Sequence, residues 1–296
     1  MGKEGSLSVH LSFIPPEIQR AELKNGLKLL VIEDHKLPLV EVTTILNSGW
    51  AADPMDKPGA GALTADLLDE GTRRRNAMEI AAEAKRLGTD IGTSSFFDGS
   101  YVSFNSLKKN LDQSLDLMAD MILNPTFPQE ELERKKQEYL GRIQQENKQP
   151  VTAAVKHYFR LLFGSDHPYG QPYTGSGTEE SISAITRDDL VDYYNSNYFS
   201  SNASVIVAGD ITVEEAVSKL EKSLGKWKKG ETALSEVPDA EPRISTEVYL
   251  LDKPSAPQSV IIMGNLGLRR SDPDYLATSV MNTAFGSQFT SRLNMN

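Results

Sequence analysis

The chain has 296 residues, 39% hydrophobic and 24% charged, which is enough for about two domains with packed cores. Its formal net charge is −10, with 41 acidic against 31 basic residues, and this argues against nucleic-acid binding, which needs clustered lysine and arginine. The one basic run, at residues 73–75, is short and predicts a solvated turn. Cysteine is absent, which excludes disulfides and thiolate chemistry. The sequence contains no run of about 18 apolar residues, so it predicts no membrane-spanning helix.

The first third of the chain alternates between strand-like and helix-like patterns. Residues 27–33 and 39–46 alternate or run apolar, as strands do. An apolar helix is expected over residues 58–72, where it ends in a Gly-Thr pair. Residues 77–87 then repeat apolar side chains at helical spacing, and Gly88 is a typical residue to end that helix.

A hairpin and a series of helices follow. Residues 91–97 and 101–106 predict two strands joined by a turn at Asp98 and Gly99. The order of elements predicts an α+β fold, a two-layer α/β roll whose mixed, mainly antiparallel sheet carries helices on one face. A buried strand is expected at 205–208. The later expected helices are at 107–123, 129–145, 151–163, 186–194 and 212–224. Thr186 and Thr212 are expected to cap the last two of these helices.

The composition changes after residue 228. The next segment is polar and contains Pro238 and Pro242, which predicts a linker. New strands are expected at 246–251 and 258–264, and a helix at 272–285. The expected parts are therefore an N-terminal extension over 1–19, a first roll over 20–228, a linker over 229–245 and the beginning of a second unit over 246–296.

Five segments carry a family resemblance through their order and spacing. They are NGLK to VIED at 25–34, LPLVEV at 37–42, GAGALTADLLDEGT at 59–72, DHPYG with GTEESI at 166–182, and NASVIVAGDI at 202–211. Together they resemble the pitrilysin/insulinase-like zinc metallopeptidases, the group of the mitochondrial processing peptidase and the cytochrome bc1 core subunits. The resemblance implies tandem homologous domains, so the second unit is expected to be a truncated second roll. Either the chain is then a fragment, or another chain covers the hydrophobic strand at 260–263.

The resemblance also indicates which functional residues are missing. The family binds zinc through His-x-x-Glu-His on one helix and through a later glutamate. Anchored on the Gly-Thr pair, the two histidines fall at Ala62 and Asp66, the general base at Ala65, and the later glutamate near Arg142. Methyl groups cannot bind zinc and a guanidinium repels a cation, so we expect no catalytic residue, no metal and no cofactor. Two arrangements of Asp66 and Arg142 are then possible: the two side chains form an ion pair, or both reach solvent.

The other residues offer no replacement site. The four histidines, His10, His35, His157 and His167, are never three or four positions apart, so no helix face presents two imidazoles, and each is expected to be a surface or capping residue. No Walker-type phosphate loop and no nucleophile elbow is present.

Three functions are compared. The expected one is a non-catalytic subunit or domain of a heteromeric zinc metallopeptidase, which shapes a peptide-binding chamber beside a zinc-bearing partner of the same family. The alternative is a structural core-type subunit with no role in proteolysis. An active peptidase conflicts with Ala62, Ala65 and Arg142. The acidic excess either favours peptides rich in positive charge or serves only solubility. Lack of cysteine suits a periplasm and a cytosol equally, and a periplasm is the favoured compartment if the chain is bacterial.

Overall fold

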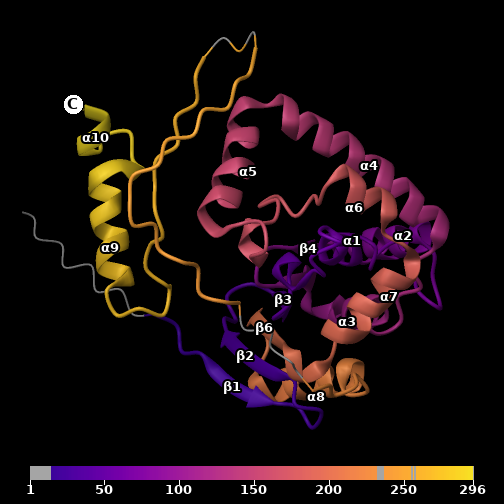
Figure 1. Cartoon of the computed structure of the whole chain (residues 1–296). Helices are drawn as coiled ribbons and strands as arrows, with labels where there is room; N and C mark the ends of the chain where they lie inside the picture. Colours follow the sequence, from indigo (N-terminus) through magenta and orange to yellow (C-terminus); the bar gives the residue numbers. More distant parts are fainter. Residues whose placement is uncertain (1–14, 232–236, 255, 257, 296) are drawn as a thin grey trace, which may run out of the picture.

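A computed structural model describes residues 15–231, 237–254, 256 and 258–295 of the chain. Six strands form one sheet in the order β1-β2-β6-β3-β5-β4, in which β2 and β6 are parallel and the other neighbours antiparallel (Figure 1). The predicted mixed, mainly antiparallel sheet is confirmed. The strands are β1 (Gln19–Glu22), β2 (Lys28–Glu33), β3 (Leu39–Leu46), β4 (Ile91–Ser95), β5 (Ser100–Leu107) and β6 (Ala203–Gly209).

One face of the sheet forms the core. In β3, every second side chain is buried, at Val40, Val42, Thr44 and Leu46, while the alternate side chains are more exposed. The register places Val42 opposite Phe104 on β5 and Val207 on β6, and all three are at most 2% exposed. This alternation of period two is what a sheet covered by helices on a single face produces.

Ten α-helices accompany the sheet in the described part of the chain. Among these residues, no helix combines the length and apolar character needed to cross a bilayer. The helices are α1 (Ala60–Asp66), α2 (Ala77–Leu87), α3 (Leu111–Leu123), α4 (Gln129–Lys148), α5 (Pro150–Phe163), α6 (Glu179–Ala184), α7 (Arg187–Asn197), α8 (Val213–Leu224), α9 (Tyr275–Asn282) and α10 (Arg292–Met295).

Several helix ends follow the predicted capping chemistry. The hydroxyl groups of Thr186 and Thr212 accept hydrogen bonds from backbone N–H groups at the third helical positions, as N-caps do. Gly88 ends α2 with a φ of +67°, a left-handed conformation that suits glycine. Asn76 begins α2 with a complete capping box, in which its partner is Glu79.

Two predicted helices of the first roll are shorter than expected. The helix expected over 58–72 is α1, which ends at Asp66 because the next backbone bonds contract to the tighter spacing of three residues, as in Leu67 N–H to Thr64 O. Leu67 and Leu68 are completely buried, so they extend the core after the helix has ended. The helix expected from residue 107 begins at Leu111, since Leu107 still pairs with β3.

The segment after the first sheet corrects a prediction. Residues 246–251 and 258–264 were expected to be strands, but none of these described residues forms a ladder, and Val248, Leu250 and Ile261 are 91%, 96% and 81% exposed. Their alternating pattern is strand-like, yet a strand needs a neighbour for its backbone groups, and no described segment supplies one. The last expected helix is reduced to α9, followed by a π-helical turn at Thr283–Ser287.

The N-terminal end adds a strand that was not predicted. β1 is only four residues long and mostly polar, so its sequence carries no alternation of apolar side chains, and it forms the edge of the sheet beside β2. Residues 1–14 of the expected extension and residues 232–236 of the expected linker lie outside the described residues.

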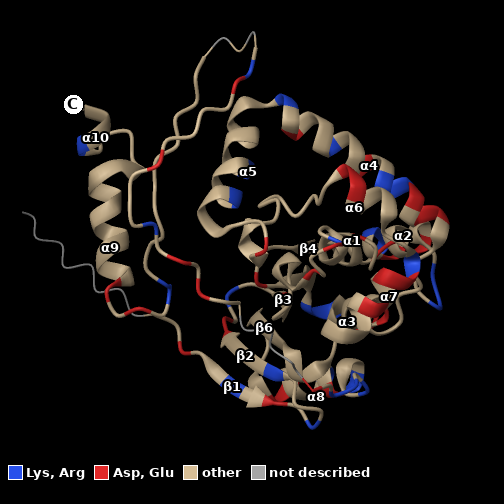
Figure 2. Ribbon diagram, viewed as in Figure 1, with Lys and Arg blue, Asp and Glu red and all other residues tan. Residues whose placement is uncertain are grey.

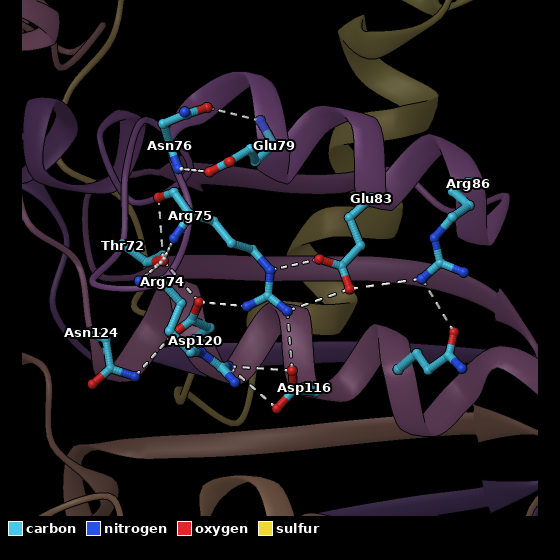
Figure 3. Close-up of polar contacts among 11 residues, drawn as sticks. Thr72, Arg74, Arg75, Asn76, Glu79, Glu83, Arg86, Asp116, Asp120 and Asn124 are labelled. Atoms are coloured by element: carbon cyan, nitrogen blue, oxygen red, sulfur yellow. Dashed lines mark hydrogen bonds and ion pairs between the residues drawn. The ribbon is translucent and has the colours of Figure 1, made fainter.

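A buried carboxylate holds the turn between α1 and α2 (Figure 3). Asp120 on α3 is 1% exposed and accepts hydrogen bonds from Thr72 Oγ1 at 2.8 Å and Arg75 Nη1 at 2.7 Å, with Arg74 Nε at 3.0 Å. Burial alone would raise the pKa of Asp120, but its hydrogen bonds outweigh that effect and lower it. The basic run at 73–75 is therefore not simply a solvated turn, because two of its arginines bind this carboxylate.

We expect Asp120→Asn to lower the free energy of unfolding by about 2 kcal/mol, because it breaks charge-assisted hydrogen bonds in a buried position. The matched control is Asp116→Asn, one turn earlier on α3. Asp116 contacts Arg74 and Arg75 at 3.3 Å, but its side chain is 54% exposed, so a loss under about 1 kcal/mol is expected. Urea unfolding followed by circular dichroism measures both.

The same pair of variants has a predicted pH dependence. Because the pKa of Asp120 is lower in the folded chain than its ordinary value of 3.8, its stabilisation is complete above that value and is lost as the pH falls through the folded pKa. The gap between wild type and Asp120→Asn should therefore close in strong acid. Equal losses for the two variants at neutral pH would contradict the role given to Asp120.

Candidate functional site

Helix α1 carries Ala62, Ala65 and Asp66, which are three of the four positions compared with the zinc-binding pattern. Ala62 and Ala65 are 8% and 1% exposed, and the Asp66 side chain is 29% exposed. Positions three and four residues apart share one side of a helix, so these three residues lie together on α1. Asp53 accepts hydrogen bonds from the backbone N–H groups at the start of the helix, at 2.6 and 2.7 Å, which fixes how α1 begins.

Helix α4 brings two further side chains to Asp66. The Tyr139 hydroxyl donates a hydrogen bond to Asp66 Oδ2 at 2.7 Å. The Arg142 guanidinium lies over the Tyr139 ring, 4.0 Å from its centroid, and Arg142 Nη2 is 4.0 Å from the same Asp66 oxygen. Asp66 and Arg142 thus approach as an ion pair at its outer distance limit, while the Arg142 side chain stays 45% exposed and also reaches solvent.

Tyr139 was not anticipated from the sequence. It is 1% exposed, and burial together with the neighbouring Asp66 charge raises its pKa well above the ordinary tyrosine value. The phenol is therefore protonated at neutral pH and acts as a hydrogen-bond donor. The signal that could have found it is its spacing, since Tyr139 precedes Arg142 by three residues and so shares its side of α4.

A second group of charges joins α4 to the segment that directly follows α1. Glu70 pairs with Arg134 Nη2 at 2.6 Å and with Lys135 Nζ at 3.0 Å. Asp69 lies beside them, and its burial, reinforced by the charge of Glu70, raises its pKa to about 6. Figure 2 shows acidic and basic residues interleaved along α4.

These donors do not fit a zinc ion. Asp66 contributes the only carboxylate at the four compared positions, whereas zinc needs three or four nitrogen, sulfur or oxygen ligands. Arg142 and Lys135 add positive charge, which opposes a cation. In the described ranges, no group of three or more His, Asp or Glu side chains is arranged to hold a metal ion.

The histidines are placed elsewhere. His35 is half-exposed and contacts Asp210 at 2.7 Å, and this hydrogen bond raises its pKa. His167 is buried, and its side chain accepts a hydrogen bond from the Tyr169 backbone N–H, so it is a capping residue as expected. His157 is exposed on α5, and His10 lies outside the described residues.

Comparison with protein families matches nearly the whole sequence. Residues 28–171 match the family described as Insulinase (Peptidase family M16), and residues 184–296 match the Peptidase M16 inactive domain. A crystal structure of a peptidase M16 inactive domain from Pseudomonas fluorescens superposes with a TM-score of 0.81 and 26% identity. That similarity covers 94% of this chain and 66% of the other.

Curated relatives are similar in sequence but longer. A probable mitochondrial-processing peptidase subunit beta of Arabidopsis thaliana is 25% identical over 274 residues, which cover 92% of this chain and 51% of the relative. An uncharacterized zinc protease of Mycobacterium leprae is 28% identical over 283 residues, which cover 93% of this chain and 61% of the relative. The chain thus spans about half to three fifths of the length of these relatives.

The purified chain is expected to contain no stoichiometric zinc, because its four compared positions supply one carboxylate, two methyl groups and one guanidinium. Elemental analysis after dialysis measures the zinc content, and thermal unfolding with and without a chelator should give the same midpoint. A zinc-bearing family member treated identically is the control. One tightly held zinc per chain would sink this prediction.

Reinstalling the ligands tests the geometry of the site directly. The variant Ala62→His, Ala65→Glu, Asp66→His, Arg142→Glu should bind one zinc per chain by calorimetry, because it restores three ligands on two helices that already face each other. The matched control keeps Arg142 and changes only α1. It should bind far more weakly, since the guanidinium then occupies the place of a ligand. If the folded quadruple variant shows no zinc affinity, the placement of Arg142 in the site is wrong.

Proposed function

The chain belongs to the insulinase-like peptidase family M16, and on that premise we propose that it is a non-catalytic subunit or domain of a heteromeric zinc metallopeptidase. In this proposal it forms part of the wall of a peptide-binding chamber, and a zinc-bearing partner of the same family performs the hydrolysis. The match of residues 184–296 to an M16 inactive domain fits a member that does not itself cleave peptides.

The observation that carries the proposal is the set of contacts around Asp66. In zinc peptidases a metal-bound water is activated, and a general base takes its proton. Ala65 offers a methyl group where that base would stand, and Asp66 is hydrogen-bonded to Tyr139 and faced by Arg142. Helix α1 thus keeps its place against the sheet while its side chains serve contacts within the chain. Hydrolysis would have to come from another subunit.

The likeness to a named subunit supports a partner. The Arabidopsis relative is described as subunit beta of a mitochondrial-processing peptidase, a protein named as part of an assembly. The acidic composition of the present chain suits peptides rich in positive charge, through faster encounter at low ionic strength.

The test is reconstitution with a family member from the same genome that carries intact His-x-x-Glu-His. The two chains should copurify, and the chain alone should cleave no fluorogenic peptide. The mixture should show a kcat/KM at least about tenfold above that of the zinc-bearing chain alone, equivalent to about 1.4 kcal/mol of transition-state stabilisation. A partner whose general-base glutamate is changed to glutamine is the control for contaminating peptidases.

The remaining outcomes separate the two candidate functions. A stable complex whose peptidase activity does not depend on this chain would favour the structural core-type subunit instead. Cleavage by the chain alone, unaffected by removal of trace metal, would contradict both.

A further inference from the structure

Two arginines on α4 differ in how their donors are used. Arg134 and Arg142 have equally exposed side chains, 45% in each case. Arg134 reaches three carboxylates at 2.5–2.6 Å, those of Glu70, Glu131 and Glu138. Among the described residues Arg142 has no hydrogen bond of normal length, and its closest carboxylate oxygen is 4.0 Å away. Its guanidinium does lie near enough to the Tyr139 hydroxyl to oppose part of the rise in the pKa of that phenol. N–H···O hydrogen bonds are about 2.7–3.2 Å long, so the N–H groups of Arg142 do not donate to this carboxylate.

The guanidinium of Arg142 is nevertheless held in place. It stacks on the ring of Tyr139, which is buried and whose hydroxyl is tied to Asp66 at 2.7 Å. Stacking uses the face of a guanidinium and leaves its N–H edge available. A positioned guanidinium with a free edge is pre-organised for an acceptor from outside the chain, because less side-chain entropy is lost when that acceptor binds.

We propose that Arg142 binds a carboxylate of a peptide, either the C-terminal carboxylate or an Asp or Glu side chain. The proposal rests on the proposed function, because it takes the ligand to be a peptide, and it names the group that this chain recognises. A carboxylate matches the planar fork of arginine with two parallel hydrogen bonds. Asp66, Asp69 and Glu70 near the end of α1 disfavour a dianion such as phosphate more than a monoanion.

The compared positions offer little competition for such a ligand. Ala62 and Ala65 present only methyl groups, so Asp66 is the one side chain of the compared set that could compete for the guanidinium. Its Oδ2 already accepts the Tyr139 hydrogen bond, and its distance to Arg142 is too long for a second one. A position that holds a metal-binding glutamate in the family pattern therefore has the opposite charge here, and the ligand that it favours is an anion.

The experiment uses three acetylated tetrapeptides and the chain without a partner. The probes are Ac-Ala-Ala-Leu-Phe with a free C-terminus, the same peptide amidated, and amidated Ac-Ala-Glu-Leu-Phe. Affinity is measured by calorimetry, and the Nε–Hε resonance of Arg142 is followed by NMR. At least one carboxylate peptide should bind about tenfold more tightly than the neutral amide and shift that resonance. The two carboxylate peptides separate the C-terminal source from the side-chain source.

Variants assign the effect to the residue. Arg142→Ala should remove the preference for the carboxylate, and Arg142→Lys should retain only part of it, because a lysine keeps the charge without the fork. Arg134→Ala is the matched control and should leave the preference unchanged. A preference that survives in Arg142→Ala, or the absence of any preference in the wild type, overturns the proposal.

This test is independent of reconstitution with a zinc-bearing chain. If the carboxylate preference depends on Arg142 but no partner is found, the proposed function fails and the anion site stands. If a partner is activated but Arg142→Ala does not alter peptide preference, only the anion site fails.

Discussion

The hydrogen bond between Tyr139 and Asp66 ties the two helices on which the interpretation of this molecule depends. α4 is a mostly polar helix, with few buried residues. Tyr139 is among its fully buried side chains, and a buried phenol needs an acceptor. Asp66, at the last position of α1, supplies it. The placement of α4 across the end of α1 is therefore defined by one polar contact as well as by apolar packing.

Ion pairs extend this junction next to Asp66. Glu70 binds Arg134 and Lys135 at 2.6 and 3.0 Å, one turn beyond the contact of Asp66. These pairs connect α4 with the segment that follows α1, so they add a second polar cross-link beside the Tyr139–Asp66 hydrogen bond. Removal of either partner from such a semi-buried pair leaves a charge with a desolvation cost, and the pairs are therefore mutually dependent.

Sequence patterns predicted those parts of the fold that are determined locally. β3 occupies the expected residues 39–46 because its alternation reports directly which side chains face the core. The strands expected at 246–251 and 258–264 failed for the converse reason, since alternation identifies a buried face but does not supply the neighbour that buries it. In the candidate site, the family resemblance identified the four compared positions, Ala62, Ala65, Asp66 and Arg142. Tyr139 and Lys135 were missed, although they precede Arg142 by three and seven residues, because helical spacing defines a common side without saying what that side contacts.

The contacts around Asp66 also distinguish a rebuilt site from one that has merely lost its ligands. Loss of ligands alone would leave side chains in water with no consistent partners. Here the carboxylate at 66 accepts a hydrogen bond from Tyr139, the same tyrosine supports the guanidinium of Arg142, and Lys135 neutralises Glu70. These contacts are compatible with one another in charge and geometry, and the positive charges of Arg142 and Lys135 oppose a divalent cation among them. Two buried oxygens of this region, Asp69 Oδ1 and Thr64 Oγ1, have no hydrogen-bond partner among the described residues, so the polar network around Asp66 is only partly satisfied. The N–H edge of Arg142 is a further place at which an acceptor could add hydrogen bonds.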